Sequence, residues 1–369
     1  MSRFVLLIGD ARTKLRELPD ESVQCVVSSP PYWALRDYGV DGQIGLEDSP
    51  KKFIAELVKV FREVRRVLRA DGTCWLNLGD TYASAGRGGV GTTSTINGEQ
   101  QLANVKARAM MRSRIVDAKP KDKHGIPWRV AFALQEDGWY LRSDIVWHKV
   151  NPMPEAVKDR PTVAHEFVFL LSKSERYFYN HEAAREPCVV GAAHPRVSLK
   201  PAGQPTSRPG AKDAERAFSR KRKTAVDQRQ GAYNAQEEEQ RPKEGKSAAS
   251  TRMGRGPGWR VKQNESFAAA TLGQAETRNW RDVWSIPSQP SPLEHYAAFP
   301  EELARRCIVA GTKRGDVVLD PFAGTCTTGV VALREGRRFI GVELNPEYAQ
   351  MGDERSRGVS FGLELGGPS

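Results

Sequence analysis

The fold of this chain is decided by the stretch Val317-Val318-Leu319-Asp320-Pro321-Phe322-Ala323-Gly324-Thr325-Cys326-Thr327-Thr328-Gly329. Its apolar start predicts a strand at 317–320, and its small residues predict a loop that enters a helix at 330–334. A second strand, at 339–342, ends in Glu343. Such segments form a nucleoside pocket, in which an acid ending the second strand can bind both ribose hydroxyls. The loop lacks a GxGxxG pattern and a lysine, so it fits neither an ordinary NAD site nor a P-loop.

A second informative segment, Ser29-Pro30-Pro31-Tyr32, follows an apolar strand predicted at 23–27. Proline fixes φ and has no N–H, so this turn is rigid and leaves its carbonyls free to accept hydrogen bonds. A hydroxyl, a carbonyl and an aromatic face held close together can bind a planar ring that carries an exocyclic amino group. Trp33, beside the turn, could either stack on a nucleic acid or cover the edge of the sheet.

The rest of the chain alternates strands with helices, which predicts an α/β fold with a parallel sheet. Strands are expected at 4–8, 73–78, 140–147 and 166–171, and helices at 51–69, 126–136 and 299–310. Asp71-Gly72 is expected to end the first of these helices. Tyr177-Phe178-Tyr179 could form the return strand of a hairpin.

Positive charge is concentrated in one segment of the 369-residue chain. Residues 191–263 hold 17 Lys and Arg against 7 Asp and Glu, so they carry +10 of the net charge of +11. The segment is rich in Gly, Pro, Ser, Gln and Ala, and such a composition cannot bury enough apolar surface to form its own core. Clustered Lys and Arg supply the salt-sensitive phosphate contacts of nucleic-acid binding, so we expect a polyanion-binding arm. The alternative is a solvated insertion without a partner.

Cysteine usage and hydropathy favour a protein of the reducing cytoplasm. Five scattered cysteines do not form a disulfide framework, and no CxxC pair or His/Cys cluster indicates a metal site. No run approaches the ~20 apolar residues of a membrane span, and the first residues lack a signal-peptide pattern. We therefore expect no metal, no membrane association and a cytoplasmic location.

These segments resemble the motifs of amino-group DNA methyltransferases. Residues 320–329 resemble the family's S-adenosyl-L-methionine motif, although serine is more usual there than Thr325 and glycine more usual than Cys326. Ser29-Pro30-Pro31-Tyr32 resembles the catalytic motif of the same enzymes. Two flanking elements resemble the family segments that contact the adenine and close over the methionine end of the cofactor, namely Gly9-Asp10 and 295–300.

The order of the parts resembles the beta class of these enzymes, because the catalytic turn precedes a variable region and the cofactor loop comes last. The resemblance implies a Rossmann-like, S-adenosyl-L-methionine-dependent methyltransferase sheet in circularly permuted order, with an inserted DNA-recognition region. The expected parts are a catalytic half at 1–180 with a mobile loop at 83–125, a basic and partly disordered target-recognition insertion at 181–279, a cofactor-binding half at 280–350 and a tail at 351–369.

The resemblance also implies two sets of site residues, neither of which includes a metal ligand. In the catalytic set, Ser29 Oγ and the Pro30 carbonyl accept the amino protons of a flipped-out base, Pro31 stiffens the turn, and Tyr32 stacks on the base. In the cofactor set, Glu343 takes the ribose hydroxyls. The full cofactor set is Asp10, which faces the adenine edge, with Phe299, Pro300, Asp320, Phe322, Ala323, Gly324, Thr325, Thr327 and Glu343.

Serine at the start of the catalytic motif favours methylation of cytosine at N4. Adenine presents the same N–C=N edge, so an N6-adenine enzyme is the alternative. Methylation of RNA or of a protein amide, and a DNA-binding protein that has lost catalysis, are more remote. The expected partner is double-stranded DNA, which implies association with the nucleoid. A cognate restriction endonuclease is a further candidate partner, and monomer and homodimer both stay open.

Three residues outside these motifs have alternative roles. Trp147 and Lys149 either border the base pocket or pack at a strand edge. His165, at the start of an apolar strand, is expected to be structural rather than a general base.

Overall fold

The computed structural model of this protein describes residues 2–35, 38–83, 119–187, 277–289 and 299–359. The chain divides into two units, one made of residues 1–186 and 277–369 and the other of residues 187–276. The second unit falls within the expected insertion at 181–279 and, apart from its first residue, lies outside the described residues. Most of the expected loop at 83–125 also lies outside them.

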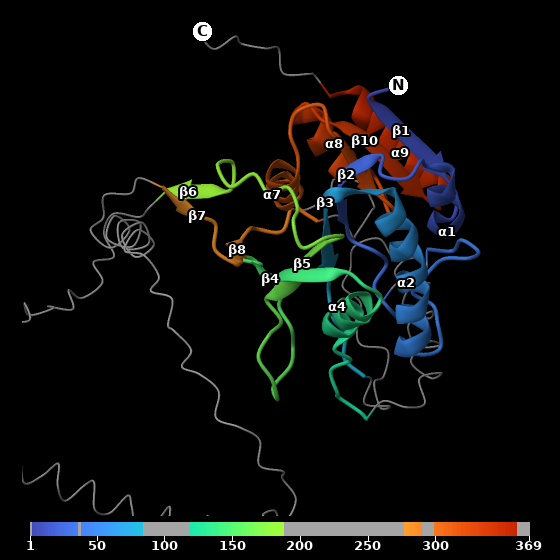
Figure 1. Cartoon of the computed structure of the whole chain (residues 1–369). Helices are drawn as coiled ribbons and strands as arrows, with labels where there is room; N and C mark the ends of the chain where they lie inside the picture. Colours follow the sequence, from blue (N-terminus) through green and yellow to red (C-terminus); the bar gives the residue numbers. More distant parts are fainter. Residues whose placement is uncertain (1, 36–37, 84–118, 188–276, 290–298, 360–369) are drawn as a thin grey trace, which may run out of the picture. The chain divides into compact units, whose positions relative to one another are not determined.

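An eight-stranded sheet forms the centre of the first unit (Figure 1). β5 is antiparallel to its two neighbours, while the other neighbouring pairs are parallel. Across the sheet the order is β1 (Phe4–Ile8), β10 (Arg338–Glu343), β9 (Val317–Asp320), β2 (Val23–Ser28), β3 (Leu68–Leu78), β5 (His165–Ser172), β4 (Tyr140–His148) and β8 (Val283–Ser285). Two short strands, β6 (Arg185–Pro187) and β7 (Thr277–Asn279), pair separately.

Helices cover both faces of this sheet, because its central strands are apolar on both sides. Alternate residues of a strand point to opposite faces. Val26 of β2 therefore packs with α1 (Ala11–Lys14), α2 (Pro50–Val67) and α4 (Ile126–Glu136). Its neighbours Cys25 and Val27 pack with α7 (Glu301–Gly311) and α8 (Thr327–Arg334). The sheet is thus the middle layer of three.

The helix expected at 51–69 is α2, and it ends earlier than predicted. Ser49 caps its N-terminus by accepting a hydrogen bond from the backbone of Lys52. The helix stops at Val67, and β3 begins at the next residue. Gly72 is therefore not a helix terminator. A Cβ there would lie 2.6 Å from Leu68 Cγ, so this glycine permits close packing inside β3.

One further expectation is wrong. Residues 177–179 form no strand; the Phe178 amide donates to Asp71 O, and the Tyr179 ring stacks over Trp75. The last described helix, α9 (Pro346–Arg357), includes the first seven residues of the segment expected as a tail at 351–369.

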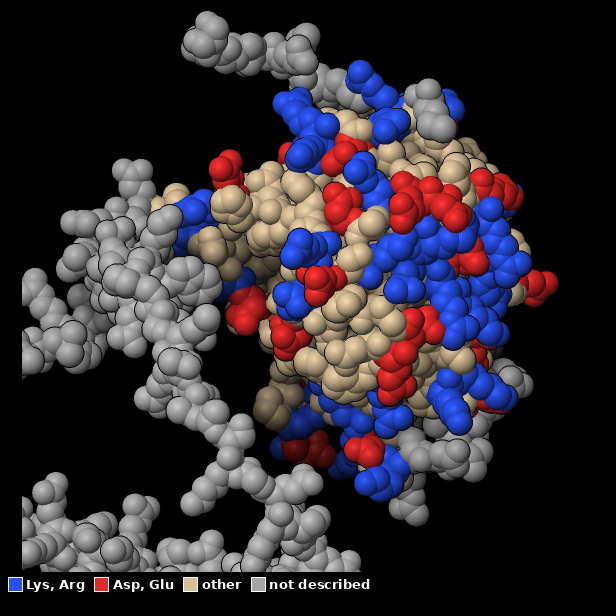
Figure 2. All heavy atoms as spheres, viewed as in Figure 1, with Lys and Arg blue, Asp and Glu red and all other residues tan. Residues whose placement is uncertain are grey.

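Lys and Arg side chains gather on the face over α2, with Asp and Glu side chains around them (Figure 2). Most of the α2 cations have an acidic partner, as in the pairs Lys52–Asp48, Lys59–Glu56, Arg62–Asp137 and Arg66–Glu63. Ion pairs of this kind are typical of the solvated face of a helix. Within the described ranges, no helix is long and apolar enough to cross a membrane.

Candidate active site

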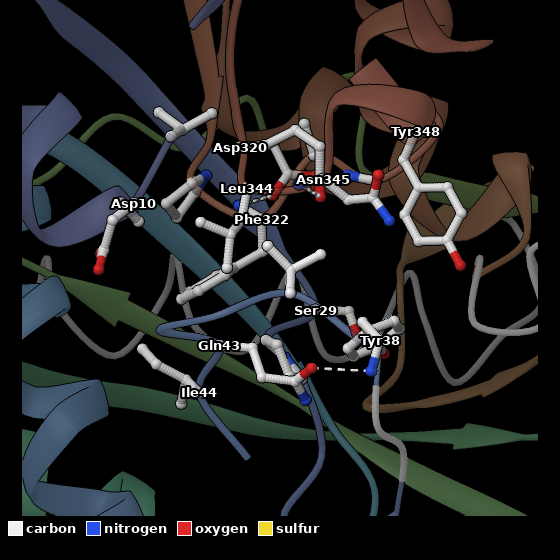
Figure 3. Close-up of a pocket in the computed structure, with 18 of the residues that line it drawn as sticks. Asp10, Ser29, Tyr38, Gln43, Ile44, Asp320, Phe322, Leu344, Asn345 and Tyr348 are labelled. Carbon is white, nitrogen blue, oxygen red and sulfur yellow. Dashed lines mark hydrogen bonds between the residues drawn. The ribbon is translucent and has the colours of Figure 1, made fainter. Parts of the chain in front are cut away.

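A cavity lies at the carboxyl ends of β9, β10 and β2, where parallel sheets bind ligands (Figure 3). We call it the Glu343 cavity. Its empty volume, which includes space open to solvent, is about 920 Å³. The predicted site residues that line it are Asp10, Ser29, Pro31, Phe299, Asp320, Phe322, Ala323, Gly324, Thr325, Thr327 and Glu343.

The Glu343 carboxylate is held in place by two backbone amides. Its Oε2 accepts from the Gly324 amide at 2.7 Å, and its Oε1 accepts from the Asn345 amide at 2.8 Å. Gly324 has a φ of +51°, a left-handed conformation that glycine adopts without strain. Burial raises the pKa of Glu343, partly offset by these two hydrogen bonds. Each oxygen keeps a lone pair, so the group can still accept from two hydroxyls.

Asp320 connects the two halves of the site across 292 residues of sequence. Its Oδ1 accepts from Ser28 Oγ at 2.7 Å and from the Phe322 amide at 3.1 Å, and its Oδ2 accepts from Thr328 Oγ1 at 2.8 Å. Burial raises the pKa of Asp320 to about 6, against the opposing effect of these bonds. The carboxylate is committed to its own neighbours, so Asp320 shapes the cavity wall and fixes the strand that carries Ser29.

The small-residue loop at 321–326 is fastened from α9. Arg355 donates to Thr325 O at 2.7 Å, to Thr325 Oγ1 at 2.9 Å and to Thr327 Oγ1 at 3.3 Å. Cys326 has a φ of +60°, a left-handed conformation that is uncommon for residues other than glycine. Sequence analysis missed Arg355 because residues from 351 onward were expected to form a tail.

Asp10 lies at the margin of the Glu343 cavity. Its carboxylate accepts from the backbone amide of Arg12 as the N-cap of α1, and its two oxygens also bind the Arg12 guanidinium. Arg12 also pairs with Glu56 and donates to Gly42 O. Asp10 thus helps to position the loop that contains Gly42, which lines the cavity.

This 38–45 loop forms a wall that sequence analysis did not assign. The Tyr38 amide donates to Gln43 Oε1 at 2.7 Å (Figure 3). The Tyr38 ring meets Tyr348 of α9 edge-on, with the ring centroids 6.4 Å apart. Tyr38, Gln43, Ile44, Asn345 and Tyr348 all line the Glu343 cavity.

A second cavity, which we call the Tyr32 cavity, adjoins the first. The two share Ser29, Tyr38 and Phe299 as lining residues. The Tyr32 cavity is otherwise lined by Pro30, Tyr32, Leu35, Asn77, Trp147, Lys149, Glu166, Ser288, Gln289 and Pro300. The turn of residues 29–32 therefore lies at the boundary between the two cavities. Pro300 lies on the Tyr32 side rather than in the Glu343 cavity.

The Tyr32 ring is fixed on one face and at its hydroxyl. A Cβ on Gly79 would lie 2.6 Å from Tyr32 Cε2, so the ring rests against the backbone of Gly79. The Tyr32 hydroxyl lies 2.7 Å from Glu166 Oε2, 3.1 Å from Asn77 Oδ1 and 3.3 Å from Ser29 Oγ. Burial and the neighbouring Glu166 carboxylate raise the pKa of Tyr32, so the phenol stays neutral.

The structure shows the surroundings of the residues outside the motifs for which two roles were considered: Trp33, Trp147, Lys149 and His165. Trp33 is buried and donates to Glu47 O, so it covers the sheet edge. Trp147 and Lys149 line the Tyr32 cavity, with Lys149 Nζ 4.8 Å from the ring centroid of Trp147. His165 packs edge-on against Phe167.

The fold and the two joined cavities define a Rossmann-like, S-adenosyl-L-methionine-dependent methyltransferase. Residues 23–354 match the N6/N4 methyltransferase family of DNA methylases, and the chain belongs to that family. It is therefore an enzyme that methylates exocyclic amino groups of DNA bases.

Several relatives cover nearly the whole chain. Type II methyltransferase M.Cfr9I of Citrobacter freundii is 41% identical over 353 residues, which cover 96% of this chain and 87% of that protein. Type II methyltransferase M.SmaI of Serratia marcescens is 38% identical over 350 residues, which cover 95% of this chain and 89% of that protein.

Solved structures show the same fold. PvuII DNA methyltransferase, described as cytosine-N4-specific, matches with a TM-score of 0.54 at 17% identity, covering 99% of this chain and 89% of that one. A putative DNA modification methylase of Thermus thermophilus, in complex with S-adenosyl-L-methionine, matches with a TM-score of 0.52 at 24% identity. The match covers 98% of this chain and 96% of that one. The expected family, fold class and cofactor are thus confirmed.

The polar groups and the apolar walls of the Glu343 cavity both suit S-adenosyl-L-methionine. Glu343 offers free lone pairs for the ribose hydroxyls, and the Gly324 backbone keeps that carboxylate in place. Phe322, Ile44 and Phe299 supply apolar surface for a flat ring and an aliphatic chain. When bound, this cofactor supplies an electrophilic methyl group on a sulfonium.

Proposed function

We propose that this protein methylates N4 of cytosine in double-stranded DNA, within a specific recognition sequence. The observation that carries the proposal is the position of Ser29, which lines both cavities. A base in the Tyr32 cavity would present its amino group at Ser29, beside the Glu343 cavity. The serine that opens the catalytic motif favours cytosine over adenine.

In the proposed reaction the protein's contribution is alignment. The exocyclic amino group is a poor nucleophile, because its lone pair is delocalised into the ring. Ser29 Oγ and the Pro30 carbonyl accept the two amino protons, which draws the nitrogen lone pair out of the ring plane. Tyr32 stacks on the base and offsets part of the few kcal/mol needed to unstack it. Holding the reacting atoms about 3–3.5 Å apart then lowers the barrier.

We further propose that Glu343 binds the ribose hydroxyls of the cofactor, while the loop 321–326 and Phe299 surround its methionine portion. Pro300 belongs to the base side in this proposal, since it lines the Tyr32 cavity. Asp10 contributes through the loop that Arg12 holds, because its own carboxylate is already bonded.

Recognition of the DNA sequence is assigned to the basic insertion at 181–279. Its Lys and Arg content suits phosphate contacts, whereas most of the α2 cations already have an acidic partner. The relatives named above are Type II methyltransferases. We therefore propose a Type II restriction–modification setting, in which a cognate endonuclease cuts the same site when it is unmethylated.

Nucleoside analysis of methylated DNA tests the target base. DNA would be incubated with the protein and cofactor carrying a labelled methyl group, digested to nucleosides and separated by mass. We expect N4-methylcytosine to carry the label. N6-methyladenine alone would refute the cytosine assignment and favour the adenine alternative. No label in DNA would refute both, and label in an RNA or protein control would identify the remote alternatives.

A further inference from the structure

Glu166 lies at the centre of a polar cluster in the Tyr32 cavity. Its Oε2 accepts from the Tyr32 hydroxyl at 2.7 Å and from Asn77 Nδ2 at 3.1 Å. Its Oε1 pairs with the Lys149 ammonium. The Glu166 side chain is only 15% exposed, so these contacts are made largely out of water. None of them is needed to form the sheet, because the backbone of β5 pairs independently with β3 and β4.

The Tyr32 hydroxyl has one proton and two acceptors within reach, Glu166 and Asn77. An ionised carboxylate is the stronger acceptor, and here it is also the closer one. Asn77 Nδ2 donates to Glu166 Oε2 and to Phe167 O, which fixes the orientation of the amide. The tyrosine proton is therefore directed to Glu166, and the tyrosine oxygen keeps its lone pairs.

The Ser29 hydroxyl is the third member of this series of hydrogen bonds, after Glu166 and Tyr32. Ser29 Oγ lies 3.3 Å from the Tyr32 oxygen and donates to it. Once that single proton is committed to Tyr32, Ser29 Oγ can act toward any other group only as an acceptor. An acceptor is what the amino protons of a target base require. A serine free to rotate could instead point its own proton at the base amino group and repel it.

We propose that Glu166 is a positioning residue that orders the hydrogen bonds from Ser29 through Tyr32, so that Ser29 Oγ presents a lone pair to the target amino group. Lys149 acts as the counter-ion that keeps Glu166 an acceptor. The inference rests on the proposed role of Ser29, and it applies to either target base, because cytosine and adenine both present amino protons.

The test is the single-turnover rate of methyl transfer to DNA in Tyr32→Phe and Glu166→Gln. Phenylalanine keeps the ring that stacks on the base but gives Ser29 no acceptor. Glutamine keeps the shape of Glu166, but its amide can donate to the Tyr32 hydroxyl. The hydrogen bonds between Glu166, Tyr32 and Ser29 could then run in the opposite direction. We expect each rate to fall about tenfold or more, the loss typical of a hydrogen bond to a charged group.

Three readouts separate this role from a structural one. Cofactor affinity should stay near wild type in both variants. Base extrusion, followed by 2-aminopurine fluorescence at the target position, should persist in Tyr32→Phe. The single-turnover rate of the double variant should be no lower than that of either single variant, because both substitutions interrupt the same series of hydrogen bonds.

Two matched controls are available. Tyr177→Phe removes a hydroxyl that accepts from Arg142. Glu155→Gln removes a carboxylate that pairs with Arg160. Neither residue lines a cavity described above, and both variants should turn over like wild type.

The proposal is overturned if Tyr32→Phe stays within twofold of the wild-type rate, or if the losses in the double variant multiply. Total methyl transfer is measured without regard to the base. A finding of N6-methyladenine would therefore refute the cytosine assignment and leave this test unaffected.

Discussion

Ser28, Ser29 and Asp320 show at the residue scale how the site is assembled. Ser28 ends β2 and donates to Asp320 at the end of β9, while the adjacent Ser29 faces the two cavities. The segments 29–32 and 320–329 could be singled out from the sequence, because each is a contiguous stretch with its own chemistry. The Ser28–Asp320 bond and the Glu166 cluster were not, because they join residues that only the fold brings together.

Ser29→Ala should abolish most methyl transfer while sparing cofactor binding. The change removes an acceptor for the amino group but leaves the Glu343 cavity intact. We expect the single-turnover rate to fall about 100-fold or more, the scale typical for loss of a group that acts in the transition state. Calorimetry with S-adenosyl-L-methionine should give a wild-type affinity. A rate within a few-fold of wild type would contradict the role given to Ser29.

Asp320 should give folding stability a distinct pH dependence. Its folded pKa, about 6, lies above the unfolded value of 3.8, so the folded state holds the proton more tightly between these values. The free energy of unfolding therefore rises as pH falls through this window. Above the window Asp320 is ionised, and the buried charge lowers the stability of the folded state. A shift of about two pKa units corresponds to at most about 3 kcal/mol.

Urea unfolding between pH 7 and pH 4 checks this expectation against Asp320→Asn, which cannot titrate. The unfolding free energy of the wild type should rise relative to that of the variant as pH falls. A constant difference across the range would show that Asp320 does not titrate as its burial requires.

At the element scale, strand and helix positions were largely predictable from periodicity, and element ends were not. Asp71-Gly72 is a common turn signal, yet Gly72 lies inside β3, where a Cβ would come within 2.9 Å of the Gln24 carbonyl of β2. Residues 177–179 have strand-like composition, but the Tyr179 ring stacks over Trp75 and the Phe178 amide donates to Asp71 O of β3. In both cases a tertiary contact overrides the local preference.

α9 should control cofactor affinity through Arg355. This side chain donates to Thr325 and Thr327, so Arg355→Ala should loosen the loop beside the Glu343 cavity. We expect S-adenosyl-L-methionine affinity, measured by calorimetry, to fall about tenfold, equivalent to about 1.4 kcal/mol.

Arg357→Ala is the matched control for that change. Arg357 lies on the same helix, is exposed and pairs with Asp353. It should bind the cofactor like wild type. Equal losses in both variants would mean that α9 acts through its general stability rather than through the Arg355 contacts.

At the scale of the whole molecule, charge is divided between a nearly neutral catalytic unit and a strongly basic insertion. Composition alone predicted this division and the partner class it favours. It could not give the DNA sequence that is recognised, because no residue-by-residue code links these residues to bases.

The basic insertion should carry much of the salt-dependent DNA affinity. Replacing the run Arg220-Lys221-Arg222-Lys223 by glutamine removes up to four phosphate contacts. The slope of log affinity against log salt should then become shallower by up to about 3.6, at about 0.9 per contact.

The same four-residue replacement on α2, at Lys51, Lys52, Lys59 and Arg62, serves as the control and should leave the slope unchanged. DNA binding would be followed by fluorescence anisotropy across a salt series. An unchanged slope for the insertion variant would contradict a polyanion-binding role for this run.

The most direct measurement of the central claim is a structure of the protein with target DNA and a non-reactive analogue of the cofactor. The account predicts the analogue in the Glu343 cavity and an extruded cytosine against Tyr32, with its amino nitrogen about 3 Å from Ser29 Oγ. An extruded base bound away from the Tyr32 cavity, or an analogue bound outside the Glu343 cavity, would contradict it.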